Sequence, residues 1–210
     1  MPPSAVTPRS LLLVLCLAFA LRLPTPGWPP PGLYHDEAYY GIDAAGVLAG
    51  DLHLYFPANN GREPLFIQLV AGFVALLGRT PAALRLTAAF VGTATVAATF
   101  AAGRLLFDRR VALCAAALLA VCPWPVILGR VGLRAGTLPL VLALAVAATL
   151  RGGTRRDHRW TVFGGALAGL TLYAYTAARV LPLLAIGWLA WRIVVRRPPD
   201  RRRLARWTAA

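Results

Sequence analysis

Seven apolar runs determine what this chain can fold into. Each run is between 13 and 21 residues long, whereas an unaided membrane helix needs about 20. Flanking residues and interfacial Trp side chains can complete the shorter ones. Only 14% of the 210 residues are charged, which is about half the usual share for a soluble domain. We therefore expect an all-α, polytopic membrane helical bundle built from these runs: Leu11–Leu23, Leu65–Leu77, Leu86–Leu106, Val111–Leu128, Leu138–Leu150, Trp160–Thr176 and Val180–Val195.

The placement of arginine predicts the topology. All 22 basic residues are Arg and the formal net charge is +14. If Leu65–Leu77 crossed the bilayer, the Arg-rich loops 103–110, 151–159 and 196–206 would lie outside, against the positive-inside rule. If that run is re-entrant or interfacial, all three loops become cytoplasmic. We therefore predict about six spans plus one such segment, with a cytoplasmic N-terminus. The first run also resembles a signal peptide, whose cleavage would leave the later topology unchanged.

The loop at residues 24–64 is then the first outside loop, and it is unusually acidic. It carries five of the eight acidic residues, including the adjacent pair Asp36 and Glu37. Ionisable groups near the hydrocarbon commonly handle ions, protons or polar substrates. We expect a short surface helix at Glu37–Ala49. Asp36 is a candidate catalytic residue, although Asp is also a favoured helix N-cap and capping would explain it without catalysis.

Basic residues converge on the same predicted face. Arg62 and Glu63 stand where the loop re-enters the apolar phase, and Arg130 and Arg134 lie between the fourth and fifth runs. Because Arg130 and Arg134 are four residues apart, we expect them to share a helix face. Arg binds phosphate through a planar fork of donors, so the set predicts a phosphate-bearing substrate. The alternatives are snorkelling side chains for Arg130 and Arg134 and a plain interfacial ion pair between Arg62 and Glu63.

The order of these motifs resembles a known family. The motifs are, along the chain, Asp36-Glu37-Ala38-Tyr39, Arg62-Glu63-Pro64-Leu65-Phe66, Arg85-Leu86, Gly103-Arg104-Leu105-Leu106-Phe107, Cys122-Pro123-Trp124-Pro125, Gly129-Arg130-Val131-Gly132-Leu133-Arg134-Ala135 and Tyr173-Ala174-Tyr175-Thr176-Ala177-Ala178-Arg179. Together they resemble the N-terminal half of polytopic C-type glycosyltransferases of the family 39 group. That group includes protein O-mannosyltransferases and the lipid A aminoarabinose transferase.

The resemblance implies transfer of a sugar from a polyprenyl-phosphate carrier to an acceptor at the outer membrane face. It implies Asp36 as general base, with Glu37 sharing that role or positioning the acceptor. Arg62, Arg130 and Arg134 would contact phosphate, and Glu63 would bind the sugar or orient Arg62. The expected partners are a lipid-linked sugar donor, membrane lipid and a glycan, lipid or protein acceptor. Nucleic acid is not expected, because the Arg residues cluster between apolar runs.

The resemblance also has a departure. Many relatives carry Asp two residues after the second Arg of the outside motif, where this chain has Gly136. His35 and His53 lack the spacing of metal ligands, so we predict no metal site, and the cofactor is left open, a divalent cation included. We expect residues 1–210 to form a single transmembrane module, the opening part of a longer protein in a bacterial inner or plasma membrane. A transporter or flippase-like protein and a noncatalytic fragment are the alternative functions.

Overall fold

The computed structural model describes residues 7–23 and 32–195. Its chain divides into two compact units, Met1–Thr176 and Ala177–Ala210. The helices of the first unit are α1 (Pro8–Arg22), α2 (His35–Leu48), α3 (Pro64–Leu77), α4 (Pro81–Leu106), α5 (Arg109–Val121), α6 (Pro123–Val131), η1 (Arg134–Gly136), α7 (Thr137–Arg155), α8 (His158–Leu170) and η2 (Thr171–Tyr173). The short η3 (Thr176–Arg179) leads into α9 (Val180–Val195) of the second unit.

The predicted all-helical fold is confirmed for the described residues, among which no strand occurs. Five of the apolar runs lie mainly on one helix each, Val111–Leu128 is divided between α5 and α6, and Trp160–Thr176 extends from α8 through η2 to the start of η3. The expected surface helix in the acidic loop is α2. Two stretches are long and apolar enough to cross a membrane: α4, and Arg134–Arg155, which contains α7. The pair α5 and α6, bent by 55°, would make a third.

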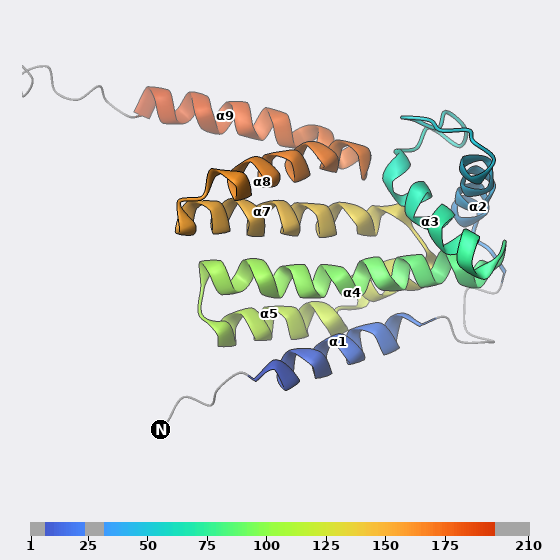
Figure 1. The fold of residues 1–210 in the computed structure, drawn as a ribbon, viewed down its shortest axis with the longest axis horizontal. Coiled ribbons are helices and arrows are strands. Elements are labelled where there is room, and N and C mark those ends of the chain that lie inside the picture. The colour runs from blue at the N-terminus through green and yellow to red at the C-terminus, as the bar shows by residue number, and fades with distance from the viewer. Residues whose placement is uncertain (1–6, 24–31, 196–210) are drawn as a thin grey trace, which may run out of the picture. The chain divides into compact units, whose positions relative to one another are not determined.

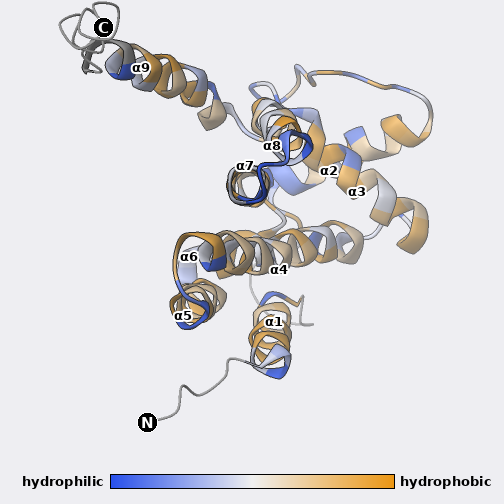
Figure 2. Cartoon of the chain, turned by 60° about the vertical axis from the view of Figure 1, so that its left-hand side comes forward, coloured by the Kyte–Doolittle hydropathy of each residue, from blue (hydrophilic) through white to orange (hydrophobic). Residues whose placement is uncertain are grey.

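The remaining helices are shorter. Helix α3 is an apolar helix of 14 residues and is shorter than the helices counted as long enough to cross a membrane. Both its re-entrant or interfacial placement and the total of six spans stay predictions. Figure 2 shows hydrophobic residues along the helices and hydrophilic ones at the connection between α7 and α8.

Local sequence signals explain where the helices begin. The side chains of Thr7, Thr80, Asp108 and Asp157 each accept a hydrogen bond from a backbone N–H of the first turn of α1, α4, α5 and α8. Proline stands in the first turn of α1, α3, α4 and α6, where its missing N–H costs nothing. Two backbone hydrogen bonds lower the pKa of the Asp108 carboxyl, which keeps this cap ionised.

Helix α4 is the centre of the first unit. It contacts α1, α3, α5, α6 and α7. Ala112, Ala116 and Ala120 of α5 are fully buried at four-residue spacing in a cluster shared with α1 and α4. Small residues at this spacing let helix backbones approach closely inside a membrane. Figure 1 shows α2 and α3 gathered at the end of the unit where α4 begins.

A second apolar cluster fixes α2 at that end. Tyr40 and Ala44 of α2 are buried against Phe66 and Ile67 of α3 and Leu84 of α4. The rings of Tyr40 and Phe66 meet edge to face, with centroids 5.4 Å apart, a favourable aromatic geometry. Packing of this face of α2 determines where the acidic residues of its first turn point.

A buried arginine stabilises the break between α5 and α6. Pro123 and Pro125 have no N–H, so the carbonyls at the end of α5 lose helical donors. Arg22, the last residue of α1, is completely buried, and its guanidinium supplies replacements. Its Nη1 donates to Ala120 O at 3.0 Å and to Ala18 O at 2.8 Å, and its Nη2 donates to Leu119 O at 3.3 Å.

The neighbouring helices leave space for this side chain only because two glycines face it. A Cβ atom at Gly92 of α4 would lie 2.7 Å from Arg22 Nε, and one at Gly129 of α6 would lie 3.0 Å from Arg22 Cδ. Backbone carbonyls that lack a partner inside a bilayer are costly. Arg22 therefore stabilises the bend between α5 and α6. This bend directs α6 toward the end of the unit where α2 and α3 lie.

We predict that Arg22 and Pro123 are energetically coupled. Arg22→Met removes the donors from Leu119 O and Ala120 O, and should lower the midpoint of thermal unfolding in detergent. Pro123→Ala restores an N–H that can reach Leu119 O, so Arg22→Met should cost less in that background. The expected coupling is about 0.5–3 kcal/mol. Arg9→Met, at an exposed position of the same helix, is the control. Additive effects of the two substitutions would contradict this role of Arg22.

Candidate active site

A tight turn in the acidic loop brings the site together. Phe56 and Arg62 exchange two backbone hydrogen bonds of 2.9 and 2.8 Å. At the tip, Asn59, Asn60 and Gly61 have positive φ angles of 49°, 63° and 79°. Asn and Gly are the residues that most readily adopt this left-handed conformation. We call this segment the Asn59 turn, and both of the polar centres described next contact it.

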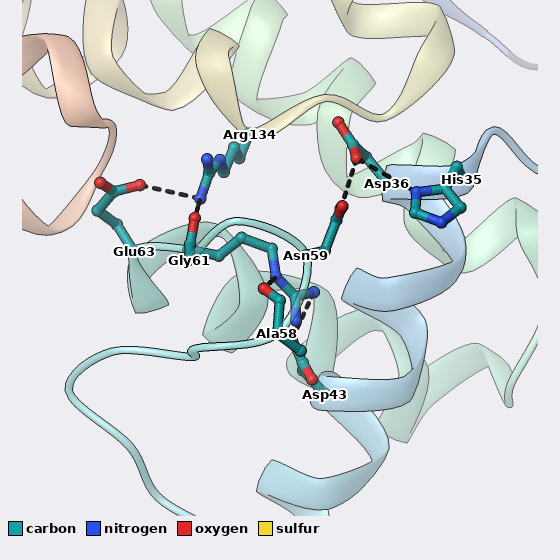
Figure 3. Close-up of polar contacts among 9 residues, drawn as sticks. His35, Asp36, Asp43, Ala58, Asn59, Gly61, Glu63 and Arg134 are labelled. Atoms are coloured by element: carbon teal, nitrogen blue, oxygen red, sulfur yellow. Dashed lines mark hydrogen bonds and ion pairs between the residues drawn. The ribbon is translucent and has the colours of Figure 1, made fainter.

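The first centre is Asp36, in the first turn of α2. Its Oδ1 accepts a hydrogen bond of 2.6 Å from Asn59 Nδ2 and lies 3.9 Å from His35 Nδ1, as Figure 3 shows. The Asp36 side chain is 37% exposed. Asp36 thus combines an oriented carboxylate with access from outside, as a general base requires.

Glu37, the adjacent residue, is completely buried and has several partners. It accepts a hydrogen bond of 2.8 Å from the backbone N of Tyr34, the residue that caps α2. It also forms an ion pair with Arg85 of α4, with Nε 3.0 Å from Oε1 and Nη2 3.3 Å from Oε2. The alternative in which Asp36 caps this helix is therefore wrong, because Glu37 performs that function.

Glu37 also fixes the chain after α6. A Cβ atom at Gly132 would lie 2.9 Å from Glu37 Oε1, and Gly132 has a positive φ of 70°. Only glycine meets both demands without strain. The buried carboxylate therefore fits a positioning role for α2, α4 and the segment after α6 better than a general-base role shared with Asp36.

Arg62 is the second buried arginine of the unit. Its side chain is 1% exposed, and Nη1 forms an ion pair of 2.6 Å with Asp43 Oδ2 on α2. Nε donates to Ala58 O at 3.1 Å, and the guanidinium lies over the rings of Tyr39 and Tyr40 at 5.0 and 5.9 Å. Burial raises the pKa of the Asp43 carboxyl, against the opposing effect of the Arg62 charge.

The second centre is Arg134, in η1. Its Nη1 lies 3.0 Å from Glu63 Oε2 and donates to Gly61 O of the Asn59 turn at 3.1 Å, as Figure 3 shows. Thr176 donates from Oγ1 to the other Glu63 oxygen at 2.7 Å. The alternative of an ion pair between Arg62 and Glu63 is therefore wrong: Glu63 pairs with Arg134, and Arg62 pairs with Asp43.

Arg130 does not share a face with Arg134, so that expectation was also wrong. Helix α6 ends at Val131, and Gly132 reverses the backbone into the left-handed region before Arg134 is reached. The Nε of Arg130 donates to Leu21 O, at the C-terminal end of α1, at 2.8 Å. Cations stabilise helix C-termini, so Arg130 fastens α6 to α1 beside Arg22.

Tyr40 lies among the charges of the site. Burial, with a smaller contribution from Asp36, raises its pKa to about 12, while Arg134 and Arg62 oppose that rise. The hydroxyl therefore stays protonated at neutral pH and can act as a hydrogen-bond donor. No group of three or more His, Cys, Asp or Glu residues able to hold a metal ion occurs in the part of the chain that the structure describes.

The structure adds residues that the sequence reading did not select: Asn59, Asp43, Arg85, Tyr40 and Thr176. Three of them had a recognisable signal. Asn59 precedes Asn60-Gly61, a dipeptide typical of tight turns. Asp43 and Tyr40 share a helical face with Asp36 at spacings of seven and four. Arg85 and Thr176 come from distant segments, and nothing local in the sequence pairs them with the acidic loop.

The fold and site define an integral membrane protein with an acidic and arginine-containing centre at one end of a helical unit. Residues 62–205 match the family described as dolichyl-phosphate-mannose-protein mannosyltransferase. The chain belongs to this family, and the predicted resemblance to the family 39 group is thereby confirmed. Membership makes it a membrane glycosyltransferase that uses a lipid-linked sugar. A search of curated proteins gave no match.

The matched segment includes Arg62, Glu63, Arg130 and Arg134 but begins after the acidic pair at residues 36 and 37. The case for Asp36 therefore rests on its geometry and on the sequence resemblance.

We predict that Glu37 and Arg85 act as a buried structural pair. Glu37→Gln removes the carboxylate charge that faces Arg85, and loss of one member of a buried pair typically costs about 3–5 kcal/mol. It should therefore lower the thermal midpoint and the yield of monodisperse protein. Adding Arg85→Gln should recover part of that loss, because the uncompensated charge is removed. His35→Gln, at an exposed neighbouring position, is the control. Wild-type stability of Glu37→Gln would contradict the assignment.

Proposed function

We propose that this protein transfers a sugar from a polyprenyl-phosphate carrier to a hydroxyl group of an acceptor at the outer membrane face. The observation that carries the proposal is the Asn59 turn, which holds Asp36 through Asn59 and Arg134 through Gly61 O. A base for the acceptor and a cation for the phosphate are thus fixed by one short segment, although they are 98 residues apart in the sequence.

In the proposed reaction, the acceptor hydroxyl attacks the anomeric carbon of the sugar. Its proton passes to the Asp36 carboxylate, which the Asn59 amide orients. The bond between the anomeric carbon and the phosphate oxygen breaks, and the carrier phosphate leaves with the electron pair. Positioned bases of this kind contribute about 10²–10⁴-fold to rate.

Arg134 would stabilise the negative charge that develops on the departing phosphate. Its hydrogen bond to Gly61 O and its ion pair with Glu63 both use Nη1, and Nη2 would address a phosphate oxygen. The Tyr175 ring, 5.5 Å from Arg134 Cζ, supports the plane of the guanidinium. Preorganised donors aimed at developing charge are commonly the largest catalytic contribution.

Arg62 and Arg130, the other two candidate arginines, have structural roles in this proposal. Arg62 is 1% exposed and paired with Asp43, so it connects the acidic loop to α2 and stabilises it. Arg130 fastens α6 to α1 through Leu21 O and sets the position of Arg134 four residues later. We thus assign phosphate binding to Arg134 in preference to Arg62 and Arg130.

The proposed orientation follows the arginine distribution. The acidic loop faces outward, the loops 103–110 and 151–159 face the cytoplasm, and α3 does not cross. The helical unit supports this arrangement, because α2 and α3 gather at the end where α4 begins, and Arg104 lies in the last turn of α4.

We predict that Asp36→Asn lowers turnover by about 10²–10⁴-fold while leaving membrane insertion and thermal stability near wild type. The amide keeps the shape of the side chain but cannot accept a proton. The measurement is transfer of radiolabelled sugar from lipid-linked donor by the purified full-length protein in nanodiscs. Asp51→Asn is the matched control, at an exposed position in the same loop. Wild-type turnover by well-folded Asp36→Asn would exclude Asp36 as the base.

We predict that the acidic loop and the start of α5 are exposed on opposite sides of the membrane. In a background without Cys16, Cys114 and Cys122, a cysteine at Leu52 should react with membrane-impermeant maleimide in intact cells. A cysteine at Arg110 should react only after permeabilisation. Both positions are exposed, so folding does not hide either one. Reaction at position 110 in intact cells would mean that α3 crosses the bilayer and that the proposed orientation is wrong.

A further inference from the structure

The opposite end of the first unit has a cavity with its own basic rim. It has a volume of about 260 Å³ and lies between the C-terminal halves of α4 and α7 and the N-terminal half of α8. Small side chains, Ala101, Ala147 and Ala148, leave this space, and larger apolar side chains of the three helices complete its wall. Its volume falls slightly below the roughly 300–1,000 Å³ of pockets that enclose a whole small molecule.

Two guanidinium groups and an indole line the same cavity. Arg104 lies in the last turn of α4, Arg151 lies near the end of α7, and Trp160 is in the first turn of α8. Arg151 Cζ lies 4.7 Å from the centroid of the Trp160 ring. The ring thus fixes the plane of the guanidinium, as stacked Arg–Trp pairs do.

These two arginines have unused binding capacity. Arg151 Nε is buried and has no hydrogen-bond partner. Within the described ranges, neither Arg104 nor Arg151 forms an ion pair, whereas Arg62, Arg85 and Arg134 at the other end each pair with a carboxylate. A buried donor without a partner is costly, and its usual explanation is a ligand or water that completes it.

Charge and shape select the occupant. The rim offers planar donor forks, which suit a phosphate, and the interior offers only apolar side chains. Interfacial tryptophan and arginine at a helix end mark the depth of lipid headgroups. Basic pockets between helices on the cytoplasmic side are suited to anionic lipid headgroups.

We propose that this cavity binds one anionic phospholipid. Its phosphate lies between Arg104 and Arg151, and the upper part of one acyl chain enters the space beside Ala147 and Ala148. The Trp160 ring covers the glycerol region. This site lies at the end of the unit opposite the acidic centre and does not depend on the proposed sugar transfer. It would fasten α8 to the bundle through a lipid that touches all three helices.

Native mass spectrometry of the delipidated full-length protein in detergent tests this proposal. Phosphatidylglycerol should give one adduct of highest affinity, and phosphatidylcholine of the same chains should bind at least about tenfold more weakly. Arg104→Gln with Arg151→Gln should weaken the phosphatidylglycerol adduct by about tenfold or more. The matched control is Arg155→Gln with Arg159→Gln, which removes two exposed arginines nearby that do not line the cavity and should leave the affinity nearly unchanged.

A second variant tests the contribution of the acyl chain separately from that of the headgroup. Ala147→Phe fills the cavity while leaving both arginines in place, and should weaken the same adduct. Equal binding of the two lipids, an equal loss in the control pair, full affinity in Ala147→Phe, or competition by inorganic phosphate alone would each overturn the proposal. A phosphatidylglycerol adduct lost only in the cavity variants would establish the site even if sugar transfer were absent.

Discussion

The structure depends on how α6 is held after the break at Pro123. Arg22 bonds the carbonyls of Leu119 and Ala120, and Arg130 bonds Leu21 O, so two arginines fasten the broken helix to the end of α1. A charged group in such a place is costly, but an arginine can donate to several carbonyls at once. The resulting bend brings the segment after α6 to the acidic loop, where Arg134 meets Glu63.

Buried and accessible charged side chains have different roles at the end of the unit that carries the acidic loop. Glu37, Arg62 and Glu63 are each at most 3% exposed and pair with Arg85, Asp43 and Arg134 respectively. Such pairs contribute little net stability but fix one arrangement strongly, since losing either member leaves a buried charge. Asp36 is different, because its carboxylate accepts a hydrogen bond from the Asn59 amide, lies near the exposed His35 and stays accessible. Rigid support around one accessible carboxylate is the arrangement that catalysis requires.

The sequence was most informative where its signals are periodic or local. The apolar runs predicted the helices, including the short helix α3, whose non-spanning role stays a prediction. The loop helix at α2 was also predicted correctly. The pairing of side chains could not be predicted, because it is decided by tertiary packing. Two adjacent residues, Arg62 and Glu63, point to different partners, and Gly132 separates Arg130 from Arg134 by ending the helix between them.

The central claim is that Asp36 contacts the acceptor hydroxyl and Arg134 contacts the carrier phosphate of the same reaction at the outer face. Photo-crosslinking tests it most directly, using a polyprenyl-phosphate sugar with a diazirine on the sugar and the full-length protein in nanodiscs. Mass spectrometry should locate the label on the first turn of α2 or on the Asn59 turn, and unlabelled donor should suppress it. Label confined to the region of Arg104 and Arg151, or unaffected by competing donor, would contradict the account.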